Sequence, residues 1–190
     1  MADAASRGRR QSKTLLLTDI QGSTRIWEHD PEVMGVAVAR HDEIVRAATE
    51  VAGGRLVKSK GEGDSTFSVF DDAGAALHAA VSLQRALAAE AWLTSEPLRV
   101  RVGIHTGEVE LRDGDFYGRA VNRAARIREL ATGASIVLSA ATVAASDAHV
   151  PNGTDLVDLG AHQLRGLVGA EHVYALAHPD LPDPDLLLAN

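Results

Sequence analysis

Hydrophobic positions along the chain form short apolar runs that alternate with longer stretches of helical period. Residues 14–20 (TLLLTDI) are a short apolar run that ends at a polar turn, which predicts a buried strand. Residues 31–52 repeat apolar side chains near the helical period and stop at Gly53-Gly54, which predicts a helix. The chain thus opens with a strand followed by helix.

Further strands and helices follow by the same reasoning. Two strand-like segments, residues 55–60 and 65–70, flank the glycine-rich run 61–64 and predict a hairpin. Alternating side chains over residues 98–106 predict another strand. The remaining predicted elements are a helix over residues 72–91, a returning strand over 108–112 with Asp113-Gly114 in the turn, a helix over 117–131, a short strand over 136–138, and late edge strands over 156–159 and 172–176.

This order of elements is typical of an α+β fold. We expect a ferredoxin-like βαββαβ core with extra helices and C-terminal strands, in which a mainly antiparallel sheet carries helices on one face. One catalytic domain is predicted over residues 13–177, between a basic, disordered tail (residues 1–12) and a C-terminal tail (residues 178–190).

Composition narrows the class of protein. The chain has 190 residues and a formal net charge of −7, which argues against a general nucleic-acid binder. It has no cysteine, which fits a reducing compartment. No apolar run approaches the ~20 residues that cross a bilayer. We therefore expect a cytoplasmic protein with no membrane span.

Two aspartates stand where predicted strands meet turns. Asp19 ends the first strand, and Asp64 closes the glycine-rich turn of the hairpin. Carboxylates on neighbouring strands can hold Mg²⁺, with substrate phosphates completing its coordination. Gly22, Ser23 and Thr24 open a helix whose N-terminus would suit a phosphate, with Ser23 or Thr24 as its N-cap. Taken singly, each aspartate fits an alternative equally well, in which Asp19 caps the helix and Asp64 shapes the turn.

Two further groups suit a nucleotide. Lys60 lies in the hairpin with the same parity as Asp64, and a lysine can donate to a purine ring. Asp115 can accept a hydrogen bond from an exocyclic amino group, so the two match the edge of adenine better than that of guanine. Asn122 and Arg126, four residues apart on a predicted helix, can hold a ribose oxygen and a charged phosphoryl group.

These residues lie in motifs that resemble the catalytic domain of class III nucleotidyl cyclases, in its bacterial and especially actinobacterial adenylate cyclase form. The resemblance extends over roughly residues 13–177. Its motifs, in chain order, are TDIQGST (18–24), KGEGD (60–64), RVGIHTGE (101–108), DFYG (115–118) and VNRAAR (121–126).

The resemblance implies a role for each residue. Asp19 and Asp64, with the backbone carbonyl of Ile20, would bind two divalent cations, Mg²⁺ or Mn²⁺. The other implied roles are adenine selection by Lys60 and Asp115, transition-state contacts by Asn122 and Arg126, and triphosphate contacts by Arg101 and Arg165. A second register, KSKGE (58–62), would make Lys58 the selector and Glu62 the ligand. Lys60 and Asp64 are preferred because Phe70 then falls at the family's strand-ending phenylalanine.

The resemblance further implies conversion of ATP to 3′,5′-cyclic AMP and pyrophosphate. Family members act as head-to-tail dimers, with metal ligands from one subunit and the asparagine and arginine from the other. Since this chain contains both sets, a homodimer with two equivalent sites is expected. The alternatives are a guanylate cyclase, which we expect to carry an acidic residue in place of Lys60, and a catalytically silent nucleotide-binding module, which would have lost part of the set. The palm domain of a nucleic-acid polymerase also uses two metal ions, but the Asn/Arg helix motif does not belong to it.

Overall fold

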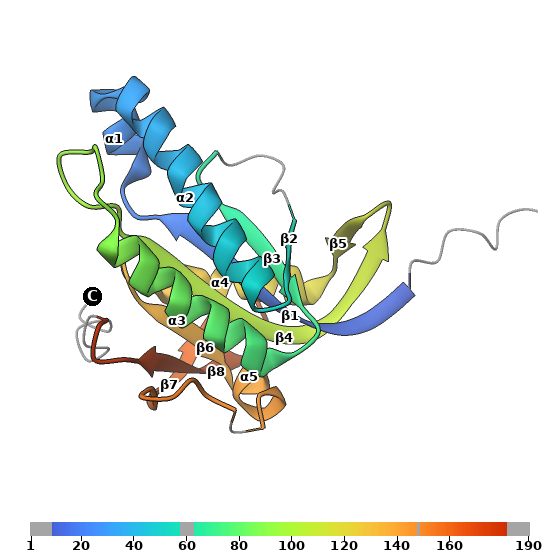
Figure 1. Ribbon diagram of the computed structural model, residues 1–190. Coiled ribbons are helices and arrows are strands. Elements are labelled where there is room, and N and C mark those ends of the chain that lie inside the picture. Colours follow the sequence, from blue (N-terminus) through green and yellow to red (C-terminus); the bar gives the residue numbers. More distant parts are fainter. Residues whose placement is uncertain (1–8, 58–62, 148, 182–190) are drawn as a thin grey trace, which may run out of the picture.

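The computed structural model describes residues 9–57, 63–147 and 149–181. Its elements in chain order are β1 (Arg9–Ile20), α1 (Ser23–His29), α2 (Pro31–Val51), β2 (Arg55–Val57), β3 (Thr66–Phe70), α3 (Ala73–Ala89), β4 (Val100–Arg112), β5 (Asp115–Tyr117), α4 (Arg119–Leu130), β6 (Ile136–Ser139), α5 (Ala140–Ala145), β7 (Asp155–Gln163) and β8 (Ala170–Ala177) (Figure 1).

One sheet organises the molecule. Its strand order is β2-β3-β1-β4-β6-β8-β7, with β5 paired to β4. Only the β4–β6 pair is parallel among the described pairs. Strands β2, β3, β1 and β4, together with α2 and α3, form the βαββαβ core, and the later strands extend it. The predicted α+β class with a mainly antiparallel sheet is confirmed.

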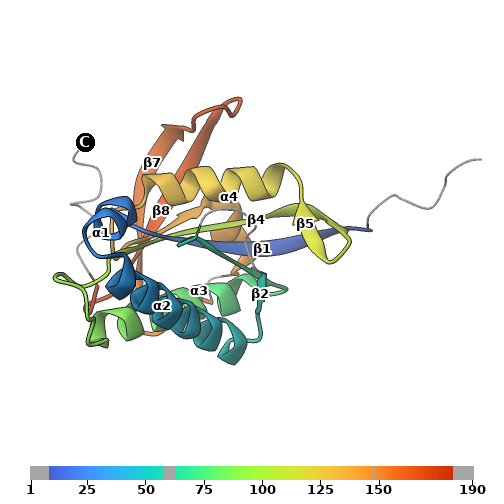
Figure 2. The ribbon, with the colours of Figure 1, turned by 90° about the horizontal axis from the view of Figure 1, so that it is seen from above.

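Helices cover both faces of this sheet (Figure 2). Leu16 and Ile20 of β1 share a core cluster with α2 and α3, whereas Leu15 and Leu17 share one with Ala120 and Ala124 of α4. The expectation of helices on one face therefore holds for α2 and α3 of the βαββαβ core, and α4 adds cover to the opposite face. The consecutive leucines of β1 reflect this arrangement, because a strand buried on both faces need not alternate.

Most of the strands are longer than predicted, and the differences in β1 and β4 change the predicted layout. β1 begins at Arg9, so residues 9–12 belong to the sheet and not to the predicted tail; Arg10 pairs with Glu110 of β4. The segment 108–112 is not a returning strand, because β4 runs unbroken to Arg112. The chain does turn at Asp113-Gly114, where both residues have positive φ (52° and 80°), and β5 is the strand that returns.

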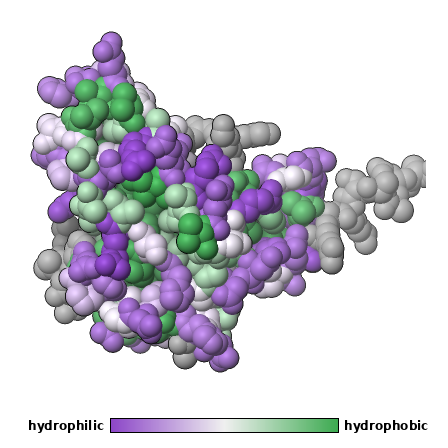
Figure 3. All heavy atoms as spheres, in the orientation of Figure 1, coloured by the Kyte–Doolittle hydropathy of each residue, from purple (hydrophilic) through white to green (hydrophobic). Residues whose placement is uncertain are grey.

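The visible surface is mainly hydrophilic, and apolar atoms gather near the end of the molecule that carries α1 and the start of α2 (Figure 3). Val36 of α2 is one of the large exposed apolar side chains there. Within the described part of the chain, no helix is long and apolar enough to cross a membrane.

Candidate active site

The two predicted metal ligands, Asp19 and Asp64, lie at one end of the sheet, where β1 ends and β3 begins. We call this place the carboxylate edge. β1 and β3 pair from Thr14↔Phe70 to Thr18↔Thr66. Asp19 is the next residue along β1, and Asp64 precedes β3 by two positions. A 2.6 Å hydrogen bond between the hydroxyls of Thr18 and Thr66 closes the ladder just before the carboxylates. The pairing of β1 with β3 therefore brings the two carboxylates to the same end of the sheet.

Both carboxylates are in a state that suits a cation. The Asp19 side chain is only 12% exposed and forms an ion pair with Arg101, its register partner on β4. Asp64 Oδ2 is buried and accepts no hydrogen bond from the residues that the structure describes. A buried carboxylate oxygen without a partner carries a large desolvation cost. A divalent cation would offset this cost at Asp64, and at Asp19 it would share or replace the contact with Arg101.

The oxygen donors of Asp19, Asp64 and Ile20 fit Mg²⁺ or Mn²⁺ if substrate phosphates complete the coordination of the ion. The described residues contain no group of three or more His, Cys, Asp or Glu side chains arranged around a common centre. An all-protein cage is therefore not formed by them. Mg²⁺ is commonly bound by one or two carboxylates plus substrate phosphates, and two carboxylates with the Ile20 carbonyl provide that kind of incomplete set.

The turn after Asp19 brings the predicted phosphate-binding residues next to this edge. Gly22 has φ 71°, a left-handed conformation that favours glycine, and it is the residue before α1. The prediction that Ser23 or Thr24 caps α1 is wrong: both are helical, Gly22 occupies the N-cap position, and no side chain caps the helix. The positive φ at Gly22 allows the chain to turn directly from β1 into α1.

Asn122 and Arg126 project away from the sheet. Ala120, Ala124 and Ile127 form the buried side of α4. Asn122 and Arg126 each lie two residues from Ala124, about 200° around the helix axis. Asn122 is exposed, and Arg126 forms an ion pair with Glu129 on the same helix. The carboxylate edge lies on the sheet side of α4, so the chain by itself does not bring the two groups together.

Asp115 lies on β5, which contacts β2 and β3 through Phe116. The ring of the next residue, Phe116, packs edge-on against Phe67 of β3, with 6.2 Å between the ring centroids. The Arg55 guanidinium lies over the Phe116 ring in a cation–π contact, 5.1 Å from its centroid. Asp115 Oδ1 accepts a hydrogen bond from the backbone N–H of Phe116. Its predicted partner Lys60, and the alternative pair Lys58 and Glu62, lie outside the described residues.

Arg165 lies in the turn between β7 and β8. Leu164, immediately before it, is buried in a cluster with Ile127 of α4 and Val173 of β8. Arg165 itself is exposed. The structure thus places it beside α4, and the predicted triphosphate contacts divide between this turn (Arg165) and β4 (Arg101).

Comparison with known proteins assigns the family. Residues 6–178 match the model of the adenylate and guanylate cyclase catalytic domain. The chain belongs to this cyclase family.

Relatives and solved structures agree with this assignment. An uncharacterized protein of Mycobacterium tuberculosis is 44% identical over 168 residues, which cover 88% of this chain and 56% of the relative. The cyclase domain therefore spans about half the length of that curated relative. An adenylate cyclase structure from Trypanosoma brucei, solved in the monomeric state, is 29% identical with a TM-score of 0.80 and 87% of both chains covered. A Catenaria anguillulae guanylate cyclase domain in complex with GTP shares the fold, at 20% identity, a TM-score of 0.77, and 90% and 98% of the two chains covered.

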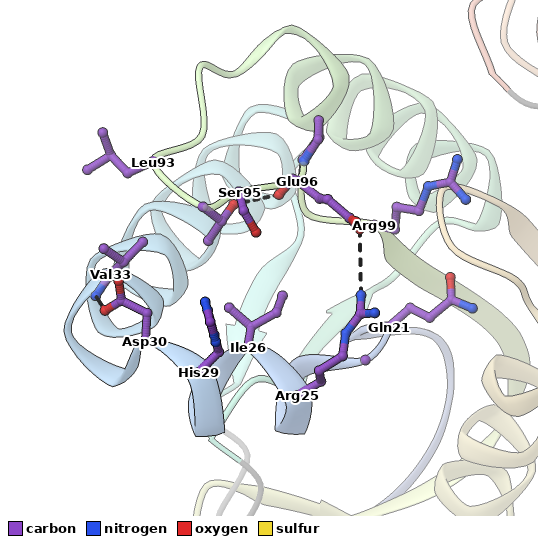
Figure 4. A pocket seen from close by; sticks show the side chains of 13 residues that line it. Gln21, Arg25, Ile26, His29, Asp30, Val33, Leu93, Ser95, Glu96 and Arg99 are labelled. Carbon is purple, nitrogen blue, oxygen red and sulfur yellow. Dashed lines mark hydrogen bonds and ion pairs between the residues drawn. The ribbon is translucent and has the colours of Figure 1, made fainter.

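The cyclase domain also has a cavity of about 860 Å³ beside the β1–α1 turn (Figure 4). It lies between α1, the start of α2 and residues 93–99, and the Arg25–Glu96 ion pair spans it at 3.5 Å. Of the predicted site residues that the structure describes, only Gly22 lines it. It is therefore not the two-carboxylate site, because neither Asp19 nor Asp64 lines it.

One residue of the carboxylate edge was missed by the sequence analysis. Arg128 of α4 donates from Nη1 to the carbonyl of Thr18 (3.2 Å) and to the hydroxyl of Ser65 (3.3 Å). These acceptors are the neighbours in sequence of Asp19 and Asp64. The available signal was helical spacing, because Arg128 follows the small Ala124 by four residues and so shares its sheet-facing side.

A buried histidine lies further along β4. His105 is 4% exposed, and a 2.8 Å hydrogen bond joins its Nδ1 to the hydroxyl of Ser139. Burial, and then the positive charge of Arg123, lower the pKa of His105 from 6.5 to about 4. The imidazole is therefore neutral in the folded protein at pH 7, and its hydrogen bond links β4 to the end of β6.

The lowered pKa of His105 predicts a pH-dependent stability. Between pH 6.5 and about 4 the unfolded chain binds a proton that the native state does not, so the free energy of unfolding falls as the pH falls through this window. The contribution is up to about 3 kcal/mol. Denaturant unfolding of the wild type and of His105→Asn, which cannot titrate, is expected to show a difference that depends on pH in this window. Parallel curves would contradict the assigned protonation state.

Proposed function

We propose that the chain is an adenylate cyclase that converts ATP to 3′,5′-cyclic AMP and pyrophosphate in a homodimer with two shared sites. The observation that supports it best is the carboxylate edge: Asp19 lies at the end of β1, Asp64 lies just before the neighbouring β3, and Asp64 Oδ2 is buried without a partner among the described residues. Family membership adds the reaction class.

In the proposed reaction the ribose 3′-oxygen forms a bond to the α-phosphorus, and the bond from that phosphorus to the pyrophosphate oxygen breaks. The hydroxyl proton leaves to solvent. When bound, two divalent cations would acidify the 3′-hydroxyl and neutralise charge on the phosphates. Asp19, Asp64 and the Ile20 carbonyl would hold them. Gly22, Ser23 and Thr24 would face the phosphates through backbone N–H groups.

The remaining residues would orient the substrate. Arg126 would donate to the α-phosphoryl oxygens as charge develops there, and Asn122 would hold the ribose. Arg101 and Arg165 would contact the triphosphate. Lys60 as donor and Asp115 as acceptor match adenine, which is the basis for proposing ATP and not GTP.

A shared site is proposed because Asn122 and Arg126 point away from the sheet that carries Asp19. Two copies arranged head to tail would each supply one half of both sites. Arg126 would have to exchange its partner Glu129 for substrate.

The direct test is incubation of the purified chain with ATP or GTP, each with Mn²⁺ or Mg²⁺, followed by mass spectrometry of the products. Cyclic AMP is expected to form from ATP at least about tenfold faster than cyclic GMP forms from GTP, and EDTA is expected to abolish both. Preference for GTP would overturn the assigned specificity. Absence of any cyclic nucleotide from a folded dimer would overturn the proposed activity.

A further inference from the structure

Arg128 joins three strands of the carboxylate edge. Its backbone packs directly on Gly103 of β4, where an added Cβ would lie 2.4 Å from the Arg128 nitrogen. From this fixed point its side chain reaches Thr18 of β1 and Ser65, the residue that precedes β3. Its Nε atom is buried and has no hydrogen-bond partner in the described part of the chain, whereas Nη1 donates to both Thr18 and Ser65.

The contacts of Arg128 lie where the pairing of β1 with β3 ends, although Asp19 remains paired with Arg101 of β4. The β1–β3 ladder ends at Thr18↔Thr66, so Asp19 and Asp64 lie beyond its last pair. The Arg128 guanidinium bridges that gap, because its acceptors are the residue before Asp19 and the residue after Asp64. The guanidinium therefore links the chain segments of the two carboxylates, one residue beyond the Thr18–Thr66 hydrogen bond.

We propose that Arg128 is a positioning residue for the two-carboxylate site, an inference that rests on the proposed function. The Arg128 guanidinium acts on metal binding in two opposite ways. Its positive charge repels a divalent cation, whereas its hydrogen bonds hold the segments that carry Asp19 and Asp64 at a fixed spacing. Positioning is the larger effect, since the guanidinium is bound to a carbonyl and a hydroxyl. Removal of such outer contacts typically lowers the metal affinity of a site about 10–100-fold.

The test measures Mn²⁺ binding by electron paramagnetic resonance, on the full chain with 3′-deoxy-ATP, which lacks the attacking hydroxyl. Arg128→Met is expected to weaken Mn²⁺ binding about 10–100-fold, and Arg128→Lys by less, because an ammonium can still donate to Thr18. Ser65→Ala, which removes one acceptor, is expected to weaken it about threefold to tenfold. The affinity for 3′-deoxy-ATP, measured without metal, is expected to stay within about twofold of wild type.

Arg123→Met is the matched control. Arg123 is on the same helix but pairs with Glu171 of β8 at 3.2 Å, away from the carboxylate edge. Its loss is expected to change Mn²⁺ affinity by less than about twofold, because it removes no contact to the residues next to Asp19 and Asp64.

Each outcome decides the proposal. Unchanged or tighter Mn²⁺ binding in Arg128→Met would show that positioning is not its role. If Arg128→Met fails to fold by circular dichroism, Arg128→Lys and Ser65→Ala decide in the same way. If the wild type forms no cyclic nucleotide and binds no Mn²⁺, the proposed function itself fails, and the role of Arg128 with it. A wild type that binds Mn²⁺ and is active, with unaffected variants, overturns the role of Arg128 alone.

Discussion

Replacement of Asp19 by asparagine is expected to reduce cyclic nucleotide formation by at least about 10³-fold, or about 4 kcal/mol of transition-state stabilisation. Asparagine keeps the shape of the side chain and a group that can accept from Arg101. It loses the charge that a divalent cation needs. The change is therefore expected in kcat measured at saturating ATP, while circular dichroism of the variant stays like that of the wild type.

Asp71→Asn provides the control for this substitution. Asp71 follows β3 and pairs with Lys13, but its side chain is 86% exposed. An exposed ion pair contributes about 0–1 kcal/mol, so activity and stability are expected to change little. An Asp19→Asn protein that keeps more than a tenth of wild-type activity would exclude Asp19 as a required metal ligand.

Mixing two inactive variants is expected to restore activity. Asp19→Asn retains an intact α4, and Arg126→Ala retains intact carboxylates. In a heterodimer of the two, one site combines both intact halves and the other combines both defects. Random pairing makes half of the dimers heterodimers, so a 1:1 mixture is expected to recover about a quarter of wild-type activity.

A second mixture tests whether this recovery has the proposed cause. Asp19→Asn and Asp64→Asn both damage the carboxylate half, so no heterodimer of them contains an intact site, and no recovery is expected. Recovery in this second mixture, or none in the first, would contradict sites shared between subunits. Analytical ultracentrifugation of each mixture would establish that dimers are present.

Much of the fold follows from periodicity. The end of the first strand at Ile20, the helix ending before Gly53-Gly54 and the turn at Asp113-Gly114 were all predicted correctly, because their signals are local. The full extent of β4 was not predicted, because a strand of this length is stabilised by pairing with a distant strand. β1 pairs with β4 from Val100 to Leu111. Helix α5 was not predicted, since six residues carry too little pattern to be distinguished from a loop.

The chemistry of the site followed from residue types and spacing, but its assembly did not. The sequence alone identified Asp19, Asp64, Asp115, Asn122 and Arg126 as candidates, from carboxylates where predicted strands meet turns, an Asn/Arg pair at helical spacing, and motifs that resemble class III cyclases. These roles remain predictions. Their geometry depends on strand order, which brings β1 between β3 and β4 and so places Asp19 near Asp64 and Arg101.

By itself, then, the sequence determined the α+β class and the candidate residues, since both depend on local pattern. The tertiary structure alone decided that Asn122 and Arg126 face away from the carboxylates, because that depends on which side of α4 packs on the sheet. It also decided the place of Arg128, whose acceptors lie 110 and 63 residues away in the chain. No local pattern encodes contacts at such separations; packing of α4 on Gly103 brings them together.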